Sequence, residues 1–414
     1  MAKSLEITFQ QQPQDRIMHE RCSGSMTMAV AAAVVGSVIA ASPTSTPAQA
    51  PTASVPALKT PWGDPDLQGI WTYEFDTPLQ RLAKYAGQEF FTEQQRAELD
   101  RERTAMLARD GRQERGSEMD VNRGYNSVFL SVKRMSARTS LIVDPTNGRI
   151  PLLTPEAQKL AAADRDFRLA LLQSTDSCKS KAVACSGGTY DPTPSPRRAE
   201  RSPRYNTGRI NRNDGPEDMS LGERCLTAGL PEFGTAFGGS FRRIVQTPGG
   251  ISLFYDVGQG QGWQRNIVMD GRPHLPKTIR QWYGDSRGRW EGNTLVIDVT
   301  NFSPKTDFQG SRENLHLTER WTRLGPSTLE YVVTIDDPTV WTRPWTVKQE
   351  FSRQSDSENR VYYEPRCIEG NYGLPGILHG RRAEERAFAE GRGPDPATRD
   401  YMTAASTLDD DPLR

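Results

Sequence analysis

The sequence predicts a mainly β protein: an antiparallel β barrel in the C-terminal half, with an N-terminal region that contributes helices and long loops. Short segments after residue 240 are rich in β-branched and aromatic residues, are separated by turn residues and have no helix between them. Such segments pair antiparallel and close into a barrel or a sandwich. They are 241–246, 251–257, 265–269, 278–283, 294–299, 314–322, 328–335, 345–351 and 360–363.

The densest β signal is the stretch 279–302, IRQWYGDSRGRWEGNTLVIDVTNF. Residues 294–300 alternate apolar and polar side chains, as a half-buried strand does. Gly292 before Asn293 predicts a type II′ turn, whose twist matches the flanking strands of a hairpin. We interpret the run 284–288, Gly-Asp-Ser-Arg-Gly, as a bend.

The N-terminal half predicts two helices. Thr92 and Gln95 form a capping-box pattern ahead of a charged helix that ends before Gly111. Thr154 precedes a second helix over 155–172. The polar stretch 174–218 is predicted to be loop, and its composition is equally compatible with disorder. A short β segment near 69–75 is expected to pair with or cap the sheet.

The first fifty residues resemble a secretory leader. Arg16 and Arg21 precede a small apolar run over 28–41, and Ala48-Gln49-Ala50 fits a signal-peptidase site. The apolar run is too short for a stable membrane span. We therefore predict a periplasmic or extracellular protein.

The predicted divisions are a leader (1–50), a wrapping region (51–225), the barrel (226–385) and a charged tail (386–414).

Composition excludes some partners. The 414 residues carry 52 basic and 52 acidic side chains, so no overall field favours nucleic acid. The chain has no P-loop, dinucleotide fingerprint or H-E-x-x-H motif, and we predict no cofactor. The sequence does not indicate an oligomeric state.

Four cysteines follow the leader, an even number that suits an oxidising compartment. Three pairings are open, and we favour Cys178 with Cys185 and Cys225 with Cys367. A metal site is the rival interpretation, but C-x₂-C spacing is absent and the histidines number only 4. We predict no metal.

Several phrases resemble a family of secreted bacterial proteins with no established activity. They include QWYGDSRGRWEGNTLVIDVTNF, MDGRPHLP, ENLHLTERWT and CIEGNYGL, and the resemblance spans about residues 60–385. It implies one exported fold. The family has a histidine where this chain has Ile368, and a His-Asp pair within 258–265. If those histidines serve chemistry in the relatives, this chain has altered or lost it. The W-E-G-N-T-L hairpin is also similar to calycin-like, lipocalin-type barrels, at the level of fold only.

Four side chains are predicted to carry acid–base chemistry: His274, His316, Asp285 and Glu369. Imidazoles exchange protons near neutral pH, and neighbouring carboxylates serve as their partners. His274 lies in a loop bounded by prolines, and His316 lies on the polar face of a predicted strand. Each side chain also has a structural interpretation, as a surface residue, a backbone partner or a tie within a turn.

The predicted ligand contacts combine arginines with aromatic rings. Arginine recognises a carboxylate or a phenolate, and aromatic side chains wall an apolar pocket, although they more often form core. The residues are Arg287, Arg320, Trp282, Tyr283, Trp321 and Tyr372. The sequence therefore predicts a protein that binds a small apolar or aromatic molecule in or beside the barrel. Cofactor-free acid–base chemistry of lyase, isomerase or hydrolase type would act on it. A non-catalytic carrier or scavenger and an envelope scaffold are the alternatives.

Overall fold

The computed structural model describes residues 58–73, 75–108, 134–205, 210–221, 224–226, 229–233, 241–258, 261–354, 370 and 372–401. The chain divides into two compact units, Met1–Ala53 and Ser54–Arg414. All described residues belong to the second unit. The predicted leader lies outside them.

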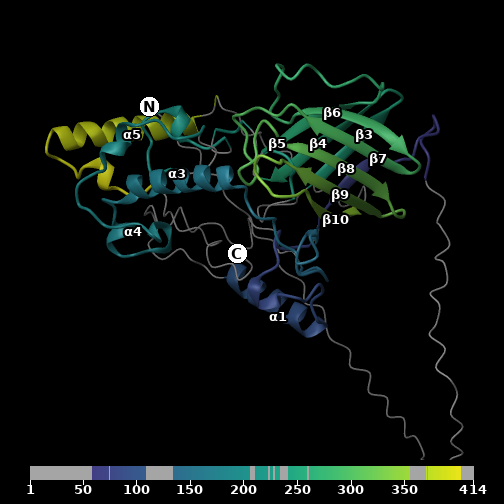
Figure 1. The fold of residues 1–414 in the computed structure, drawn as a ribbon, viewed down its shortest axis with the longest axis horizontal. Coiled ribbons are helices and arrows are strands. Elements are labelled where there is room, and N and C mark those ends of the chain that lie inside the picture. The colour runs from purple at the N-terminus through teal and green to yellow at the C-terminus, as the bar shows by residue number, and fades with distance from the viewer. Residues whose placement is uncertain are drawn as a thin grey trace, which may run out of the picture. The chain divides into compact units, whose positions relative to one another are not determined.

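The described strands form one closed barrel, which confirms the predicted fold class (Figure 1). The ten-stranded sheet has the order β1-β3-β4-β5-β6-β7-β8-β9-β10-β2, and β1 also pairs with β10, which closes the ring. Because β2 pairs only with β10, nine strands make up that ring. The strands are β1 Gly69–Thr72, β2 Ile142–Asp144, β3 Phe241–Thr247, β4 Gly250–Gly258, β5 Gln261–Val268, β6 Asp285–Glu291, β7 Thr294–Thr300, β8 His316–Arg323, β9 Thr328–Asp336 and β10 Trp345–Arg353.

One pair of neighbours in the ring, β5 and β6, is parallel and joined by the single register pair Val268 with Arg287. Parallel neighbours need a crossover connection. Residues 269–284 supply it as an extended strap across the outer face of β6 and β7, where the Asn301 side chain donates to the Leu275 carbonyl at 2.8 Å. The β5–β6 seam is therefore held by side chains as well as by strand pairing.

Side chains that point inward form the hydrophobic core of the barrel. In β8, Leu317, Glu319 and Trp321 are buried, whereas His316 and Arg320 on the alternate positions are half-buried. The alternation follows from the two-residue period of a strand. It places His316 and Arg320 on the outer face of the barrel.

The interior also holds a buried ion pair. Arg265 Nη1 lies 3.0 Å from Glu319 Oε1, and Arg265 Nη2 pairs with Glu319 Oε2. Tyr331 Oη and Trp321 Nε1 each lie 3.4 Å from this carboxylate. A buried charge requires such compensation.

Most strand predictions are confirmed, but that for 278–283 is wrong. Residues 284–288 were expected to bend, yet β6 begins at Asp285 and pairs with β7 over its whole length. Gly292 has the expected positive φ, 60°, at the hairpin turn. The segment 360–363 lies outside the described residues.

Helix predictions based on caps are confirmed. At α1, Gln95 N donates to Thr92 Oγ1 and Thr92 N donates to Gln95 Oε1, which is the predicted capping box. At α3, Thr154 Oγ1 accepts from Ala157 N at 3.2 Å. The α-helices are α1 Glu93–Ala108, α3 Pro155–Leu172, α4 Asp176–Lys179 and α5 Gly373–Ala389. Short 3-10 helices are η1 Ala83–Tyr85, η2 Val183–Cys185, η3 Pro196–Ala199, η4 Pro216–Asp218 and η6 Pro396–Thr398.

The predicted Cys178–Cys185 disulfide is present and joins α4 to η2, with the two Cα atoms 5.0 Å apart. Cys225 is disulfide-bonded too. Its predicted partner, Cys367, lies outside the described residues.

Candidate functional site

The strap carries His274 between two carboxylates. His274 Nδ1 lies 2.9 Å from Asp285 Oδ2, and His274 Nε2 lies 2.7 Å from Asp298 Oδ1. Asp285 also accepts from Leu275 N at 2.9 Å and from Arg287 Nε at 3.1 Å. His274 thus links the strap to both β6 and β7.

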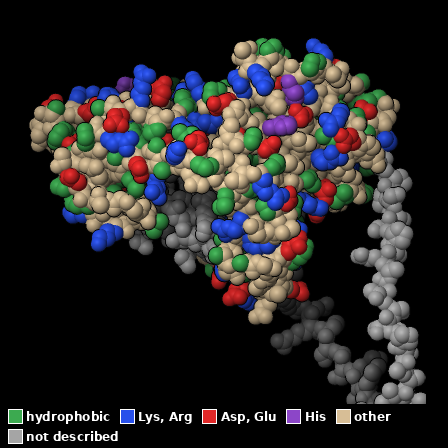
Figure 2. Space-filling view, in the orientation of Figure 1, with side chains coloured by type: hydrophobic (Ala, Val, Ile, Leu, Met, Phe, Trp, Pro, Cys, Tyr) green, Lys and Arg blue, Asp and Glu red, His purple; other side chains and the backbone are tan. Residues whose placement is uncertain are grey.

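Asp298 extends this arrangement to the next strand. Its Oδ2 lies 2.9 Å from His316 Nε2, and His316 pairs in register with Asp336 of β9. The result is a continuous series of contacts, Asp285 to His274 to Asp298 to His316, which we name the His–Asp chain. It runs from a buried carboxylate to an imidazole that is 43% exposed. Figure 2 shows histidine side chains at the surface over the barrel.

The electrostatics favour the charged forms of Asp285, Asp298 and His316. The hydrogen bond to Asp298 raises the pKa of His316, and the charges of Asp298 and Asp336 add to this effect against partial burial. The bond from His316 lowers the pKa of Asp298, and His274 contributes further. Burial raises the pKa of Asp285, but donation from Leu275 N, Arg287 and His274 outweighs it and lowers the pKa overall. A neutral imidazole has one N–H, so His274 donates to both ionised carboxylates only when it carries two protons.

Three of the four predicted catalytic residues therefore meet. Asp285, His274 and His316 belong to one His–Asp chain, and the predicted ligand residue Arg287 pairs with Asp285. Glu369 lies outside the described residues.

The other predicted ligand residues do not join the chain. Arg320 lies on the same outer face but pairs with Glu291 at 2.9 Å. Trp321 is buried in the interior, and Tyr372 is 95% exposed. Tyr283 stacks on Trp263 with ring centroids 5.4 Å apart, towards the barrel interior.

Trp282, also predicted to touch a ligand, is half-buried at the end of the strap. Sequence reasoning missed Asp298, the residue that joins both imidazoles. The pattern of residues 294–300 could have suggested it, because a carboxylate interrupts the outer face of an otherwise apolar and threonine-containing strand.

A pocket of about 460 Å³ lies between α3 and the end of the barrel that contains the start of β8. Its apolar wall comes from Leu153, Ala157, Leu160, Ala161 and Val340. Its polar wall includes Arg204, Arg312, Glu313, Asn314 and Asp337. The helix is fixed to the barrel there because Thr154 N donates to Val340 O at 2.9 Å.

The pocket adjoins the His–Asp chain along two strands. Asn314 lies two residues before His316, and Asp337 follows Asp336, the register partner of His316. Two residues of extended chain span about 7 Å. His316 therefore lies two extended residues, about 7 Å along the backbone, from a lining residue of a pocket in the size range of small-molecule sites, and His316 itself does not line that pocket.

Within the described ranges, no group of three or more His, Cys, Asp or Glu side chains is arranged to hold a metal ion. No helix in the described part of the chain is long and apolar enough to cross a membrane.

Comparison with known proteins adds little to this geometry. No family model and no curated protein sequence matches the chain. The chain is similar to the crystal structure of the fluorescent protein UnaG N57A mutant, at 16% identity, over 28% of this chain and 72% of that chain. The TM-score is 0.18. The fold class accordingly rests on the strand pairing, and the candidate site rests on the His–Asp chain and the pocket beside it.

Proposed function

We propose that this protein is exported and binds a small, largely apolar or aromatic molecule in the pocket between α3 and the barrel. His316, held by Asp298, exchanges a proton with that molecule without a cofactor. The observation that carries the proposal is a half-exposed imidazole at the end of a hydrogen-bonded chain, two residues along the backbone from Asn314, which lines the pocket.

The chemistry of the pocket supports a mixed ligand. One wall is aliphatic, from α3 and Val340, and the opposite wall carries two guanidinium groups. Arg204 is paired with Asp164, and Arg312 with Asp307 at 3.2 Å, so both cations are partly compensated. An aromatic or aliphatic body with one polar or anionic group fits this division.

The geometry of His316 supports proton transfer. Asp298 fixes Nε2, and among the described residues none bonds to Nδ1. A carboxylate behind one ring nitrogen orients the imidazole and stabilises its charged form, while the other nitrogen faces the reacting group. His274 and Asp285 position Asp298 rather than touch the ligand.

A non-catalytic carrier is the second candidate. It is favoured by the aliphatic wall of α3, which can hold a ligand without any proton transfer. The scaffold interpretation relies on a different fact: His274 ties the crossover strap to the barrel whether or not a ligand binds.

Binding is tested with small aromatic carboxylates and phenols, screened against the full chain by ligand-observed NMR. Ala161→Trp places an indole in the pocket and is expected to weaken binding at least tenfold. Ala162→Trp is the matched control, because Ala162 is exposed on the same helix and does not line the pocket. Equal binding by the two variants would place the ligand elsewhere.

Proton transfer is tested on whichever compounds bind. His316→Gln is expected to abolish turnover and to leave affinity within about threefold, whereas His379→Gln, an exposed histidine of α5, leaves both unchanged. Binding without turnover in the unmodified protein would instead support the carrier.

A further inference from the structure

A second cavity, of about 780 Å³, lies between the segment 198–205 and the segment 212–218. Four arginines contribute to its wall: Arg198, Arg201, Arg204 and Arg212. Acidic side chains line it too, so their pairing decides which cations remain uncompensated.

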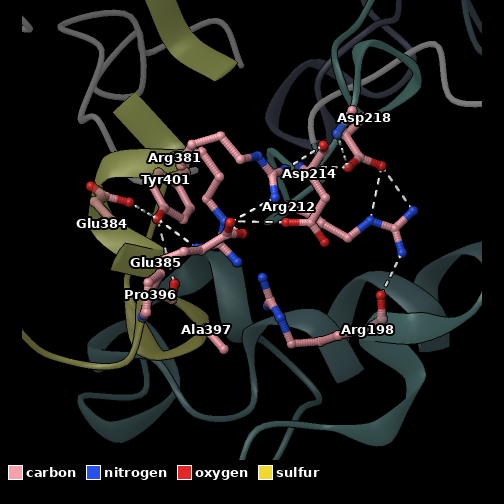
Figure 3. Close-up of polar contacts among 12 residues, drawn as sticks. Arg198, Arg212, Asp214, Asp218, Arg381, Glu384, Glu385, Pro396, Ala397 and Tyr401 are labelled. Carbon is pink, nitrogen blue, oxygen red and sulfur yellow. Dashed lines mark hydrogen bonds and ion pairs between the residues drawn. The ribbon is translucent and has the colours of Figure 1, made fainter. Parts of the chain in front are cut away.

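Most of the charges around this cavity are already paired (Figure 3). Arg212 Nη2 lies 2.8 Å from Asp218 Oδ1, and Asp218 Oδ2 accepts from two backbone N–H groups. Asp214 pairs with Arg381 Nε at 3.1 Å, and Arg381 also contacts Glu385. These acids therefore have little capacity left for another cation.

Three charged lining residues, Arg198, Arg201 and Glu217, form no ion pair among the described residues. Arg198 Nη1 donates to the Leu171 carbonyl at 3.0 Å, but Nη2 is buried with no hydrogen-bond partner. No carboxylate among the described residues forms an ion pair with it. Burial lowers the pKa of Arg198, and the nearby charge of Arg381 lowers it further. Figure 3 shows the Arg198 side chain near the Arg381–Asp214 pair, whose charges act on it.

A guanidinium nitrogen that is buried without an acceptor is costly, because its N–H groups lose water and gain nothing in exchange. Native proteins leave few such groups, and each one calls for an explanation such as a bound ligand. An oxyanion suits such a donor best, because carboxylate and phosphate oxygens accept hydrogen bonds from guanidinium groups.

We propose that this cavity is a binding site for a compact oxyanion, a carboxylate or a phosphate group of a small molecule, held principally by Arg198. Arg201, exposed at the rim, adds a second positive charge. Arg204 lines both cavities, but neither Arg198 nor Arg201 lines the pocket of the proposed acid–base function, so variants of these two residues test the anion site separately.

The test is calorimetric titration of the full chain with inorganic phosphate and, separately, with citrate, at low ionic strength. Saturable binding of one or both is expected, and which of them binds more tightly identifies the oxyanion. Arg198→Gln is expected to weaken that binding at least tenfold. Arg165→Gln removes the same charge from an exposed position of α3 and should leave affinity unchanged.

A thermal-unfolding measurement separates binding from a structural role. Without anion, Arg198→Gln should leave the melting temperature unchanged or raise it, because an uncompensated buried charge is removed and Leu171 O still accepts from Asn211 Nδ2 at 3.1 Å. With anion, only the protein that retains Arg198 should gain stability. Absence of saturable binding, or equal affinity for Arg198→Gln and the unmodified chain, would overturn the proposal.

Discussion

At the scale of single residues, Asp298 is decisive because its two oxygens contact two different imidazoles. Oδ1 meets His274 and Oδ2 meets His316, at 2.7 and 2.9 Å. Removing the negative charge of Asp298 weakens both contacts at once. The His–Asp chain therefore behaves as a unit, and its titration can be assigned by changing this one residue.

We expect the pKa of His316, measured from the pH dependence of its imidazole NMR signals, to lie above the ordinary value of 6.5. Asp298→Asn should lower that pKa towards 6.5, since the bond to Asp298 is the largest cause of the shift. His379 provides an internal reference in the same spectra. A His316 pKa that does not respond to Asp298→Asn would rule out the coupling.

The same pair predicts how stability depends on pH. Because the pKa of His316 is raised in the folded protein, protonation of His316 stabilises the fold. This contribution is fully present below pH 6.5 and is lost as the pH rises through the pKa of the folded protein. Because the pKa of Asp298 is lowered in the folded protein, its ionised form also stabilises the fold. This contribution is present above pH 3.8 and is lost as the pH falls through the pKa of the folded protein. Urea unfolding should therefore show a larger destabilisation by His316→Gln at about pH 5.5 than at about pH 9. A destabilisation independent of pH would show that the pair contributes no titration-linked stability.

The buried Arg265–Glu319 pair predicts a larger effect. Glu319→Gln leaves the Arg265 guanidinium charged in an interior where both side chains are almost inaccessible. The expected loss in the free energy of unfolding is about 3–5 kcal/mol, measured by urea denaturation. The double variant Arg265→Met with Glu319→Leu should recover most of it, because no unpaired charge remains. A loss below about 1 kcal/mol for Glu319→Gln would mean that water reaches the pair.

Residue types alone indicated His274, His316 and Asp285 as candidate site residues, but they did not indicate Asp298, which contacts both imidazoles. An imidazole or a carboxylate in a loop is a candidate whatever surrounds it. Asp298 belongs to a strand whose outward positions are ordinarily solvated, and the crossover strap brings His274 against it. That strap exists because β5 and β6 are parallel, which local sequence patterns do not encode.

At the scale of elements, local patterns predicted what local forces determine. The caps at Thr92 and Thr154 fix helix starts through side chain to backbone bonds within one turn, so both helices were predictable. Strands with one buried face show a clear alternation of apolar and polar residues in the sequence. In β6, both Asp285 and Ser286 are buried, because the strap covers its outer face. Its alternation is therefore weak, and the sequence suggested a bend.

Thr154 joins a helix cap to the docking of α3. Its hydroxyl accepts from Ala157 N and donates to Thr339 O at 2.8 Å. Thr154→Ala should cost about 1–2 kcal/mol of unfolding free energy and weaken ligand binding in the pocket, which α3 lines. Thr154→Ser keeps the hydroxyl and should change neither quantity appreciably. If alanine and serine behave alike in calorimetry, the cap does not support the pocket.

At the scale of the whole molecule, closure of the barrel depends on two weak joins. β1 closes one side of the ring because it pairs with both β3 and β10. Trp71 lies in this strand, and the Arg323 guanidinium group lies 5.3 Å from the centre of its ring. The β5–β6 seam closes the other with one register pair. The remaining neighbours are paired over most of their length, so the seam is where the ring should open first.

Gly288 permits close packing at this seam. A Cβ atom there would meet Met269 Sδ and would lie 2.7 Å from Ile267 Cγ2, so Gly288→Ala forces β6 away from β5. The expected cost is about 1–3 kcal/mol of unfolding free energy. Backbone amides of β5 and β6 should also exchange hydrogen faster, whereas those of β8 and β9 should not.

Gly249→Ala, at a turn with no atom near the added methyl group, is the matched control. Adding Met269→Ala to Gly288→Ala should restore part of the lost stability, because it removes one of the two clashes. Uniform exchange across all strands would instead mean that the barrel opens as one cooperative unit and that its seam has no special weakness.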